Sequence, residues 1–519
     1  MRGFIILFLS TVGLPSTSSL HPCNRPCGGE PKLCKFHLTA RVQQVGEPDA
    51  PLADGRPRPV LTYNKKLPGP LLVVCEDDIV RVKLTNLITD GPVTNSDGSP
   101  NSTTLHFHGI RQLGLHKDKD YTSSKFGFGP WSDGVPYVTQ CPISGANESS
   151  AVNTFIYQFK AGNISPGDFN APPGTYWYHS HEGAQRTNGL QGGLIIKDKE
   201  PPRPHVRDNP VRQTIILQEW YESPVCQVPV SILVNGKGRV PEKKFDCDDD
   251  EEDAKYLKGH GGHFAKKDFI PSENHVYTTY EEFRVRLGGP YRFRILGLIG
   301  QNFPIRFSID DHTFTAIAAD SLYIKPIRNL TNLWVAAGER YDILLKPKSR
   351  ADWHSQKEAF KIRLIGFGDI TDNTTALCSI AWLKYPGQVI DYNYTTPHDC
   401  SDFDLLTPSD YPPPQRTLNP PGISYKDWIQ RLQFPDWRNL SAVGSIYPVD
   451  FRSSFKNDTS NVYSTNFIKF QPSNTFNNIR STFPRVPYLL QSEDKSEHCD
   501  NANKGSKSRK YYPENGDSP

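Results

Sequence analysis

Two His-x-His repeats, each in a strand-like setting, constrain the fold of this chain more than any other feature. His106-Phe107-His108 follows Thr103-Thr104-Leu105, and His179-Ser180-His181 follows Gly174–Tyr178. In a β-strand, residues i and i+2 point to the same face and lie about 6.5–7 Å apart. Each repeat can therefore direct two imidazoles to one place, and two such strands side by side can direct four.

The four imidazoles of His106, His108, His179 and His181 predict a metal site. Neutral imidazole is the commonest protein ligand for copper and zinc. One His-x-His repeat is a weak signal, but two of them in strand-like settings are seldom produced by chance. The alternative interpretation is that all four are structural histidines whose hydrogen bonds are satisfied within the protein.

Composition favours sheet over helix. The chain has 45 Pro and 39 Gly among many short runs rich in Val, Ile, Leu, Tyr and Phe, which is typical of β-proteins. Its 519 residues exceed what one hydrophobic core usually holds, so we expect several domains. The net charge is only +3 and the basic residues are scattered, which gives no case for nucleic-acid binding.

The N-terminus predicts secretion. Arg2, the apolar run Phe4–Leu9 and the small residues of Pro15–Ser19 are typical of a signal peptide, which we place at residues 1–19. The apolar run is too short to span a bilayer, and no later segment reaches about 18 apolar residues. The sequence therefore predicts a secreted protein without a transmembrane segment.

Cysteines and glycosylation motifs agree with an extracellular location. The ten cysteines are even in number and are expected to form disulfides, although their pairing cannot be deduced from sequence. Asn-x-Ser/Thr motifs, typical of a secreted glycoprotein, occur at Asn101, Asn147, Asn163, Asn329, Asn373, Asn393, Asn439 and Asn457.

Breaks in composition divide the chain. We expect a cysteine-containing leader at 20–35, one all-β domain at 36–200, a second at 205–400, a partial third at 415–500 and a disordered tail at 501–519. The clearest strand-like runs are 71–74, 79–84, 155–159, 175–179, 193–196, 213–218, 291–295, 313–318, 333–335, 341–345, 465–470 and 488–490. The acidic run Asp246–Asp253 reads as a solvated loop, with a cation site as the alternative.

Ordered together, several motifs resemble the first half of a multicopper oxidase, with the closest likeness to the laccases of insects and other animals. Thr104–Ile110, Trp131–Ile143 and Gly174–His181 carry most of the resemblance. Similar patterns, a cysteine-bearing leader among them, occur at His21–Cys23 with Cys27 and Cys34, Pro68–Pro70, Asp78–Asn86, Tyr291–Ile295, Ala319-Asp320 and Gly338–Asp342. The resemblance covers roughly residues 20–390 in detail, and Asn477–Gln491 more faintly.

The resemblance implies tandem cupredoxin domains, which are Greek-key β-sandwiches, two of them complete and a third partial. It also implies a type 1 copper that takes electrons from phenols or diamines, and a tricopper cluster that reduces O2 to water. Carried over to this chain, His106 would bind the type 2 copper, and His108, His179 and His181 the type 3 pair.

The resemblance also assigns roles near the cluster. Asp133 would be a carboxylate beside the copper ions that relays protons, and the alternative is a turn residue in Trp131–Gly134. Trp177 and Tyr178 are interpreted as core packing rather than electron carriers. Cys141 is expected in a disulfide rather than as a copper ligand.

The sequence departs from the family in its second half. The family's remaining ligands lie in a His-Pro-x-His-x-His segment and a His-Cys-His segment, and nothing here matches either one. After residue 400 the only histidine is His498, and His260 with His263 read as part of a solvated loop. We therefore expect a truncated chain with half of the cluster's ligands and no type 1 site, inactive as written. The alternatives are a non-catalytic secreted copper-binding module and, within the family, a ferroxidase or ascorbate oxidase.

Overall fold

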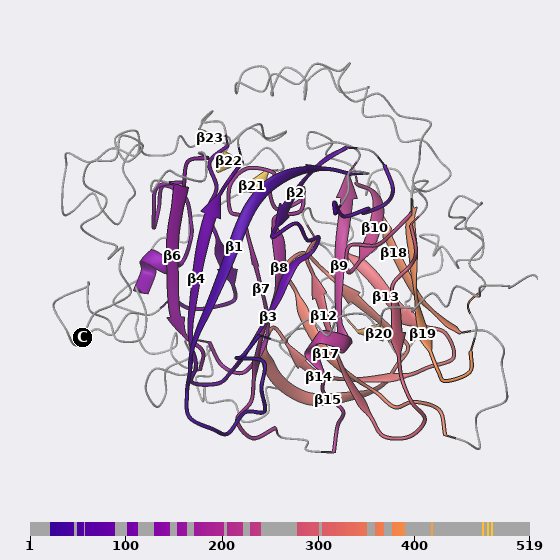
Figure 1. Ribbon diagram of the computed structural model, residues 1–519. Coiled ribbons are helices and arrows are strands. Elements are labelled where there is room, and N and C mark those ends of the chain that lie inside the picture. Colours follow the sequence, from indigo (N-terminus) through magenta and orange to yellow (C-terminus); the bar gives the residue numbers. More distant parts are fainter. Residues whose placement is uncertain are drawn as a thin grey trace, which may run out of the picture.

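The regular structure of the protein is almost entirely β-sheet (Figure 1). The computed structural model describes residues 21–390 except for 46–48, 57, 89–100, 113–128, 146–152, 163–170, 202–204, 222–228, 240–277, 300–303, 350–358, 368–375 and 389. Beyond residue 390 it describes four short strands. In these residues the helical elements are α1 (Pro210–Gln213) and the 3-10 turn η1 (Gly129–Ser132). The prediction of an all-β protein is confirmed.

The first half of the chain forms a sandwich of two four-stranded sheets. One has the order β2-β1-β4-β6, from β1 (Leu33–Gln44), β2 (Pro59–Tyr63), β4 (Ile79–Asn86) and β6 (Thr154–Lys160). The other has the order β3-β8-β7-β5, from β3 (Gly69–Cys75), β5 (His106–His108), β7 (Gly174–His179) and β8 (Gln191–Lys197). Alternate residues of β4 (Val80, Val82 and Leu84) pack into one core with Leu72 and Leu194 of the facing sheet, as the period of two requires.

The second half forms a larger sandwich of two six-stranded sheets. One has the order β10-β9-β12-β17-β14-β15, from β9 (Thr214–Tyr221), β10 (Pro229–Val234), β12 (Tyr291–Gly297), β14 (Phe314–Ala319), β15 (Leu322–Leu330) and β17 (Arg340–Leu345). The other has the order β11-β19-β18-β13-β16-β20, from β11 (Glu282–Arg284), β13 (Ile305–Ile309), β16 (Asn332–Val335), β18 (Phe360–Phe367), β19 (Ala376–Lys384) and β20 (Thr417–Leu418). Their inner faces share one apolar core.

The predicted runs between residues 71 and 345 are strands, with small differences at their ends. Gln213 ends α1 and does not begin β9, and Leu33–Lys35 of the predicted leader belong to β1. Outside the described residues lie the predicted signal peptide, the acidic run Asp246–Asp253, the pair His260 and His263, and the predicted tail. Most of 415–500 also lies outside, apart from β20 and the strands β21 (Phe470–Gln471), β22 (Thr475–Phe476) and β23 (Ile479–Arg480).

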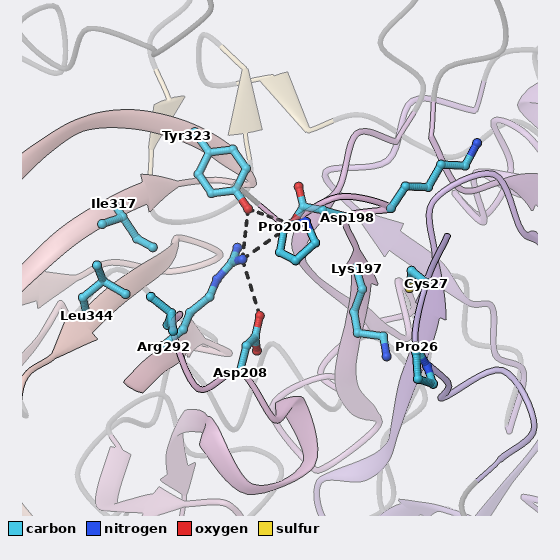
Figure 2. A pocket seen from close by; sticks show the side chains of 12 residues that line it. Pro26, Cys27, Lys197, Asp198, Pro201, Asp208, Arg292, Ile317, Tyr323 and Leu344 are labelled. Atoms are coloured by element: carbon cyan, nitrogen blue, oxygen red, sulfur yellow. Dashed lines mark hydrogen bonds and ion pairs between the residues drawn. The ribbon is translucent and has the colours of Figure 1, made fainter. Parts of the chain in front are cut away.

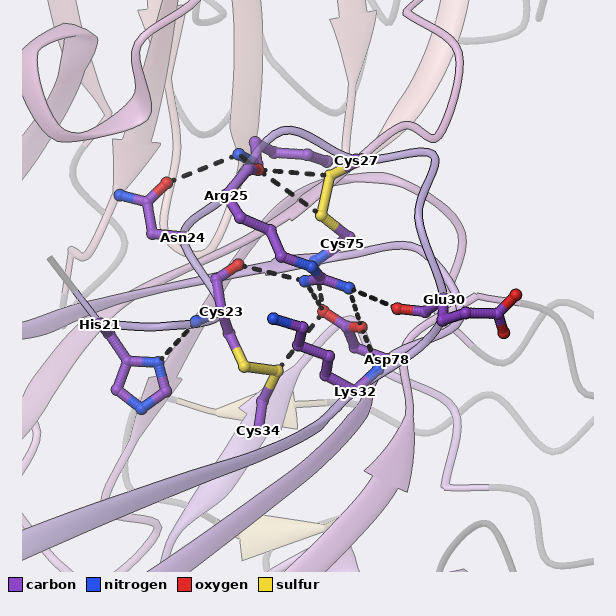
Figure 3. A network of polar contacts seen from close by, with 11 residues as sticks. His21, Cys23, Asn24, Arg25, Cys27, Glu30, Lys32, Cys34, Cys75 and Asp78 are labelled. Carbon is purple, nitrogen blue, oxygen red and sulfur yellow. Dashed lines mark hydrogen bonds and ion pairs between the residues drawn. A yellow bond between two sulfur atoms is a disulfide. The ribbon is translucent and has the colours of Figure 1, made fainter.

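Two disulfides fasten the leader to the first sandwich: Cys23–Cys34 and Cys27–Cys75 (Figure 3). Between them, Arg25 donates to both carboxylate oxygens of the fully buried Asp78 at 2.8 Å. Such a bidentate pair fixes the relative orientation of the two side chains and also pairs their opposite charges.

Cys141 and Cys378 are also disulfide-bonded. The expectation for Cys141 is therefore confirmed. These bonds agree with an oxidising compartment.

The two sandwiches meet along a packed junction. Trp177 of β7 lies in an apolar cluster with Ile216, Leu296 and Leu298 of the second sandwich. Thr175 donates to Asp342 at 2.7 Å across the same junction.

At a second point of contact, a cavity of about 310 Å³ opens between Lys197–Lys199 and the second sandwich (Figure 2). Tyr323 donates to Asp198 across it at 2.7 Å. The junction is therefore apolar at its centre and tied by polar contacts beside it.

Candidate metal centre

Strand pairing brings the two repeats together. β5 and β7 are antiparallel neighbours, with His106 opposite His179 and His108 opposite Trp177. Phe107, Tyr176 and Tyr178 point into the core of the first sandwich, so the alternate residues of both strands point to the opposite face. The predicted convergence of the imidazoles follows from this register.

All four predicted histidines lie in one group. The ring centroid of His106 is 5.9 Å from that of His108, 5.2 Å from that of His179 and 5.3 Å from that of His181. One ligand nitrogen from each of His106, His108 and His179 lies within 4.8 Å of the others. His181, which follows the end of β7, completes the group at a centroid distance of 5.8 Å from His179. This spacing is suitable for holding metal ions between the rings.

Hydrogen bonds orient two of the rings. His106 Nδ1 lies 2.6 Å from the carbonyl oxygen of Asp133, and His179 Nδ1 lies 2.7 Å from that of Ser180. Because a carbonyl oxygen only accepts, Nδ1 carries the proton and the Nε2 lone pair is left for a metal.

The Nε2 atom of His179 is buried and has no hydrogen-bond partner among the described residues. Buried polar atoms seldom stay unsatisfied. A metal ion in front of this nitrogen would satisfy it.

The surroundings keep two of the imidazoles neutral. Burial, together with the charge of Arg340, lowers the pKa of His108 to about 3. Burial also lowers the pKa of His179 well below its ordinary value. Only a neutral imidazole offers a lone pair to a metal, so these rings are ready to coordinate near pH 7 without first losing a proton.

Two groups enclose the ring of His108. The Trp177 ring stacks on His108 with centroids 4.7 Å apart. On another side lies Gly338 of the second sandwich, where a Cβ would stand 2.9 Å from Cε1 of His108. The sequence identified Gly338 only as part of a family pattern. No local signal shows that contact, because it joins residues from different domains.

Trp177 and Tyr178 are both completely buried. Trp177 packs at the domain junction and Tyr178 inside the first sandwich. The side chain of Tyr178 also donates to the carbonyl of Pro70 at 2.6 Å.

Asp133 has features both of a turn residue and of a carboxylate placed beside the histidines. Its carbonyl orients His106, and its carboxylate Oδ1 lies 3.5 Å from the same Nδ1. The following Gly134 has φ +74°, and a Cβ there would stand 1.9 Å from the carbonyl oxygen of Leu105. The turn is therefore pressed against the strand that carries His106, and the carboxylate, 31% exposed, lies beside the imidazole group.

Comparison with known proteins identifies the family. Residues 44–201 and 212–385 each match a family described as multicopper oxidase, Cu-oxidase_3 and Cu-oxidase respectively. Together the two matches span more than half of the chain. The chain belongs to the multicopper oxidase family. Its two sandwiches are the cupredoxin-fold domains of this family of copper-dependent oxidoreductases.

Relatives with curated descriptions include laccases. Laccase-1 of Fomitopsis schrenkii is 27% identical over 305 residues, 58% of this chain and 44% of that protein. Laccase-5 of Trametes villosa is 28% identical over 340 residues, 64% of this chain and 50% of that protein. The chain thus spans about half the length of the curated relatives it matches.

Solved structures with similar chains include multicopper oxidases from other sources. Fet3p, a multicopper oxidase that functions in iron import, has a TM-score of 0.45 at 22% identity, covering 72% of this chain and 56% of that one. The laccase from Botrytis aclada has a TM-score of 0.45 at 23% identity with the same coverage. Among the described residues, no helix is both long and apolar enough to cross a membrane.

Proposed function

We propose that the four histidines bind copper in a laccase-like oxidase that oxidises phenols or diamines and reduces O2 to water. His106 is assigned to the type 2 copper, and His108, His179 and His181 to the type 3 pair. The observation that carries the proposal is the unsatisfied, buried Nε2 of His179 within a group of four converging imidazoles.

The donor set fits copper. Imidazole nitrogen is a good ligand for copper ions, and hydrogen bonds at Nδ1 raise its basicity and fix its direction. His106 and His179 both have such bonds. When bound, copper supplies the one-electron redox chemistry that reduction of O2 requires.

The protein's own residues have three tasks at this site. The histidines position the metal, while Trp177 and the Gly338 turn keep solvent away from His108. We assign Asp133 to proton supply, because its carboxylate is both partly exposed and 3.5 Å from the ring of His106. A group with access to solvent on one side and to the site on the other can pass protons inward.

Secretion is part of the proposal. The signal-like N-terminus and the Asn-x-Ser/Thr motifs support it, and so do the disulfide-bonded cysteines of the leader.

Copper binding to the chain as printed tests the site assignment. We expect His106→Ala and His108→Ala to reduce bound copper, measured by elemental analysis after dialysis, to a small fraction of the parent's. The matched control is His37→Ala, since His37 is an exposed histidine on β1 outside the group. Equal copper in the parent and both site variants would overturn the assignment.

The alternative function is non-catalytic copper binding, for which the four imidazoles of the two His-x-His repeats would be the ligands. Oxygen uptake with a phenol, together with absorbance near 600 nm, separates the two functions. Ferrous iron and ascorbate as alternative reductants test the related activities in the same assay.

A further inference from the structure

A basic groove lies at the end of the second sandwich, apart from the histidines. It has a volume of about 580 Å³ between Arg207, α1, the end of β11, the start of β12 and the turn after β19. Its lining includes five cationic side chains and no carboxylate. The cationic residues are Arg207, Arg212, Arg284, Arg286 and Lys384.

Most of these cations lack an acidic partner. In the described part of the chain, Arg284 forms an exposed pair with Glu282 at 3.2 Å, and the other four form no ion pair. Arg284 and Lys384 are direct neighbours in the register of β11 and β19. Like charges directly opposite each other destabilise a sheet, so an anion between them would relieve a cost that the fold otherwise bears.

Hydrogen bonds hold the side chain of Tyr291 in place in the lining of the groove. Its hydroxyl oxygen accepts hydrogen bonds from Arg207 Nη1 at 2.7 Å and from the backbone N–H of Arg286 at 2.9 Å. The guanidinium of Arg207 also lies over the Tyr291 ring, 5.1 Å from its centroid. With two hydrogen bonds accepted, the phenol proton remains available for donation to a third group. One guanidinium and one hydroxyl are therefore held in place before a ligand arrives.

The residue types select the ligand chemistry. Guanidinium groups bind sulfate, phosphate and carboxylate oxygens with paired N–H donors. Both aromatic residues of the lining, Tyr291 and Tyr385, are buried at 6% and 1% exposure. The groove therefore offers no open aromatic face for stacking bases, as single-stranded nucleic acid would need.

We propose that this groove binds a linear sulfated polysaccharide. Five cations in the lining of one groove suit a repeating anion better than a single small ion. The disulfides place the protein in an oxidising compartment, where the polyanions are chiefly glycans rather than nucleic acids. The proposal is independent of copper, because the lining shares no residue with the histidine group.

The test measures binding of a heparin oligosaccharide to the full chain by titration calorimetry at low salt. The double variant Arg212→Glu with Arg286→Glu should bind about 20-fold more weakly, since each basic residue near an anionic surface contributes roughly a factor of five. Raising the salt concentration from about 50 to about 200 mM should weaken the binding of the oligosaccharide to the parent protein.

The control carries the same change in charge elsewhere on the second sandwich. Lys325→Glu with Arg328→Glu alters two exposed residues of β15, and we expect its affinity to stay close to the parent's. Lys384→Gln gives a milder groove variant, and circular dichroism checks that all the variants are folded. Loss of binding in the control equal to that in the groove variant would overturn the proposal.

The remaining outcomes are also decisive. No binding by the parent at low salt would refute the proposal. Tighter binding of a single-stranded oligonucleotide, of vesicles containing phosphatidylserine or of free inorganic phosphate, lost in the same groove variant, would replace the polysaccharide with that ligand.

Discussion

Gly338 of the second sandwich lies close to the ring of His108. It has φ +79°, a conformation that L side chains rarely adopt, and a Cβ would stand 2.9 Å from Cε1 and 3.0 Å from Nε2 of the imidazole. The absence of a Cβ at this position therefore lets the second domain lie close to the histidine group.

Gly338→Ala should weaken copper binding and lower the free energy of unfolding by about 1–3 kcal/mol, because both the backbone and His108 must move. The matched control is Gly288→Ala. Gly288 has a similar φ of +72° but nothing within 4 Å of a Cβ. It should show only the backbone cost, about 1 kcal/mol, and unchanged copper affinity. Equal copper affinity in both variants would argue against a role for the Gly338 contact.

At the scale of elements, the register of β5 and β7 brings the histidines together. In the second sandwich, the segment before α1 is joined to β12 by ion pairs. Arg294 of β12 donates to both carboxylate oxygens of Asp208, and Arg292 Nη1 lies 3.5 Å from Asp208 Oδ2. Burial raises the pKa of Asp208, but the hydrogen bonds and charge of Arg294 outweigh it and hold the pKa below its usual value near 3.8.

This depressed pKa predicts acid sensitivity. A carboxyl group with a lower pKa in the folded state stabilises the protein above the unfolded pKa, and this contribution is lost as pH falls through the folded pKa. Asp208→Asn should cost about 1–3 kcal/mol at pH 7 and should make the loss of stability below about pH 4 shallower.

Urea unfolding at neutral and acid pH measures both effects of Asp208→Asn. Glu200→Gln, at an exposed position, is the control. An unchanged acid profile in Asp208→Asn would show that this pair is not responsible.

At the scale of the whole molecule, hydrogen bonds join the two sandwiches beside the histidine group. Arg340 of β17 donates from Nε to the carbonyl of Thr175 on β7 at 3.0 Å, and from Nη1 to the carbonyl of Gly338 at 3.0 Å. The guanidinium also lies next to Gly109, where a Cβ would meet Nη2 at 2.6 Å. One side chain thus contacts the turn after the first repeat, the strand that carries His179 and the turn beside His108.

Arg340→Ala should therefore uncouple the domains. Its loss leaves buried carbonyls unsatisfied and should cost about 2–4 kcal/mol, with a single thermal transition becoming two in calorimetry. Arg328→Ala, an exposed position on β15, should keep the parent's profile. A single transition at an unchanged temperature in Arg340→Ala would contradict this coupling of the domains.

The sequence alone determined the sheet class, the strands at its clearest runs and the shared face of the two histidines within each repeat. Period-two alternation is a local property, so His106 and His108 had to share a face once the run around them was extended. The order of the flanking motifs, also local, identified the family before any fold was known.

The tertiary structure decided what surrounds those histidines. The contact of Gly338 with His108, the carbonyl of Asp133 at His106 and the cations gathered from Arg207 to Lys384 join residues far apart in the chain. Such contacts depend on how two sandwiches pack and on where separate turns meet, and no local pattern in a sequence encodes either. The sequence supplied the histidines, and the packing of the two sandwiches supplied their surroundings.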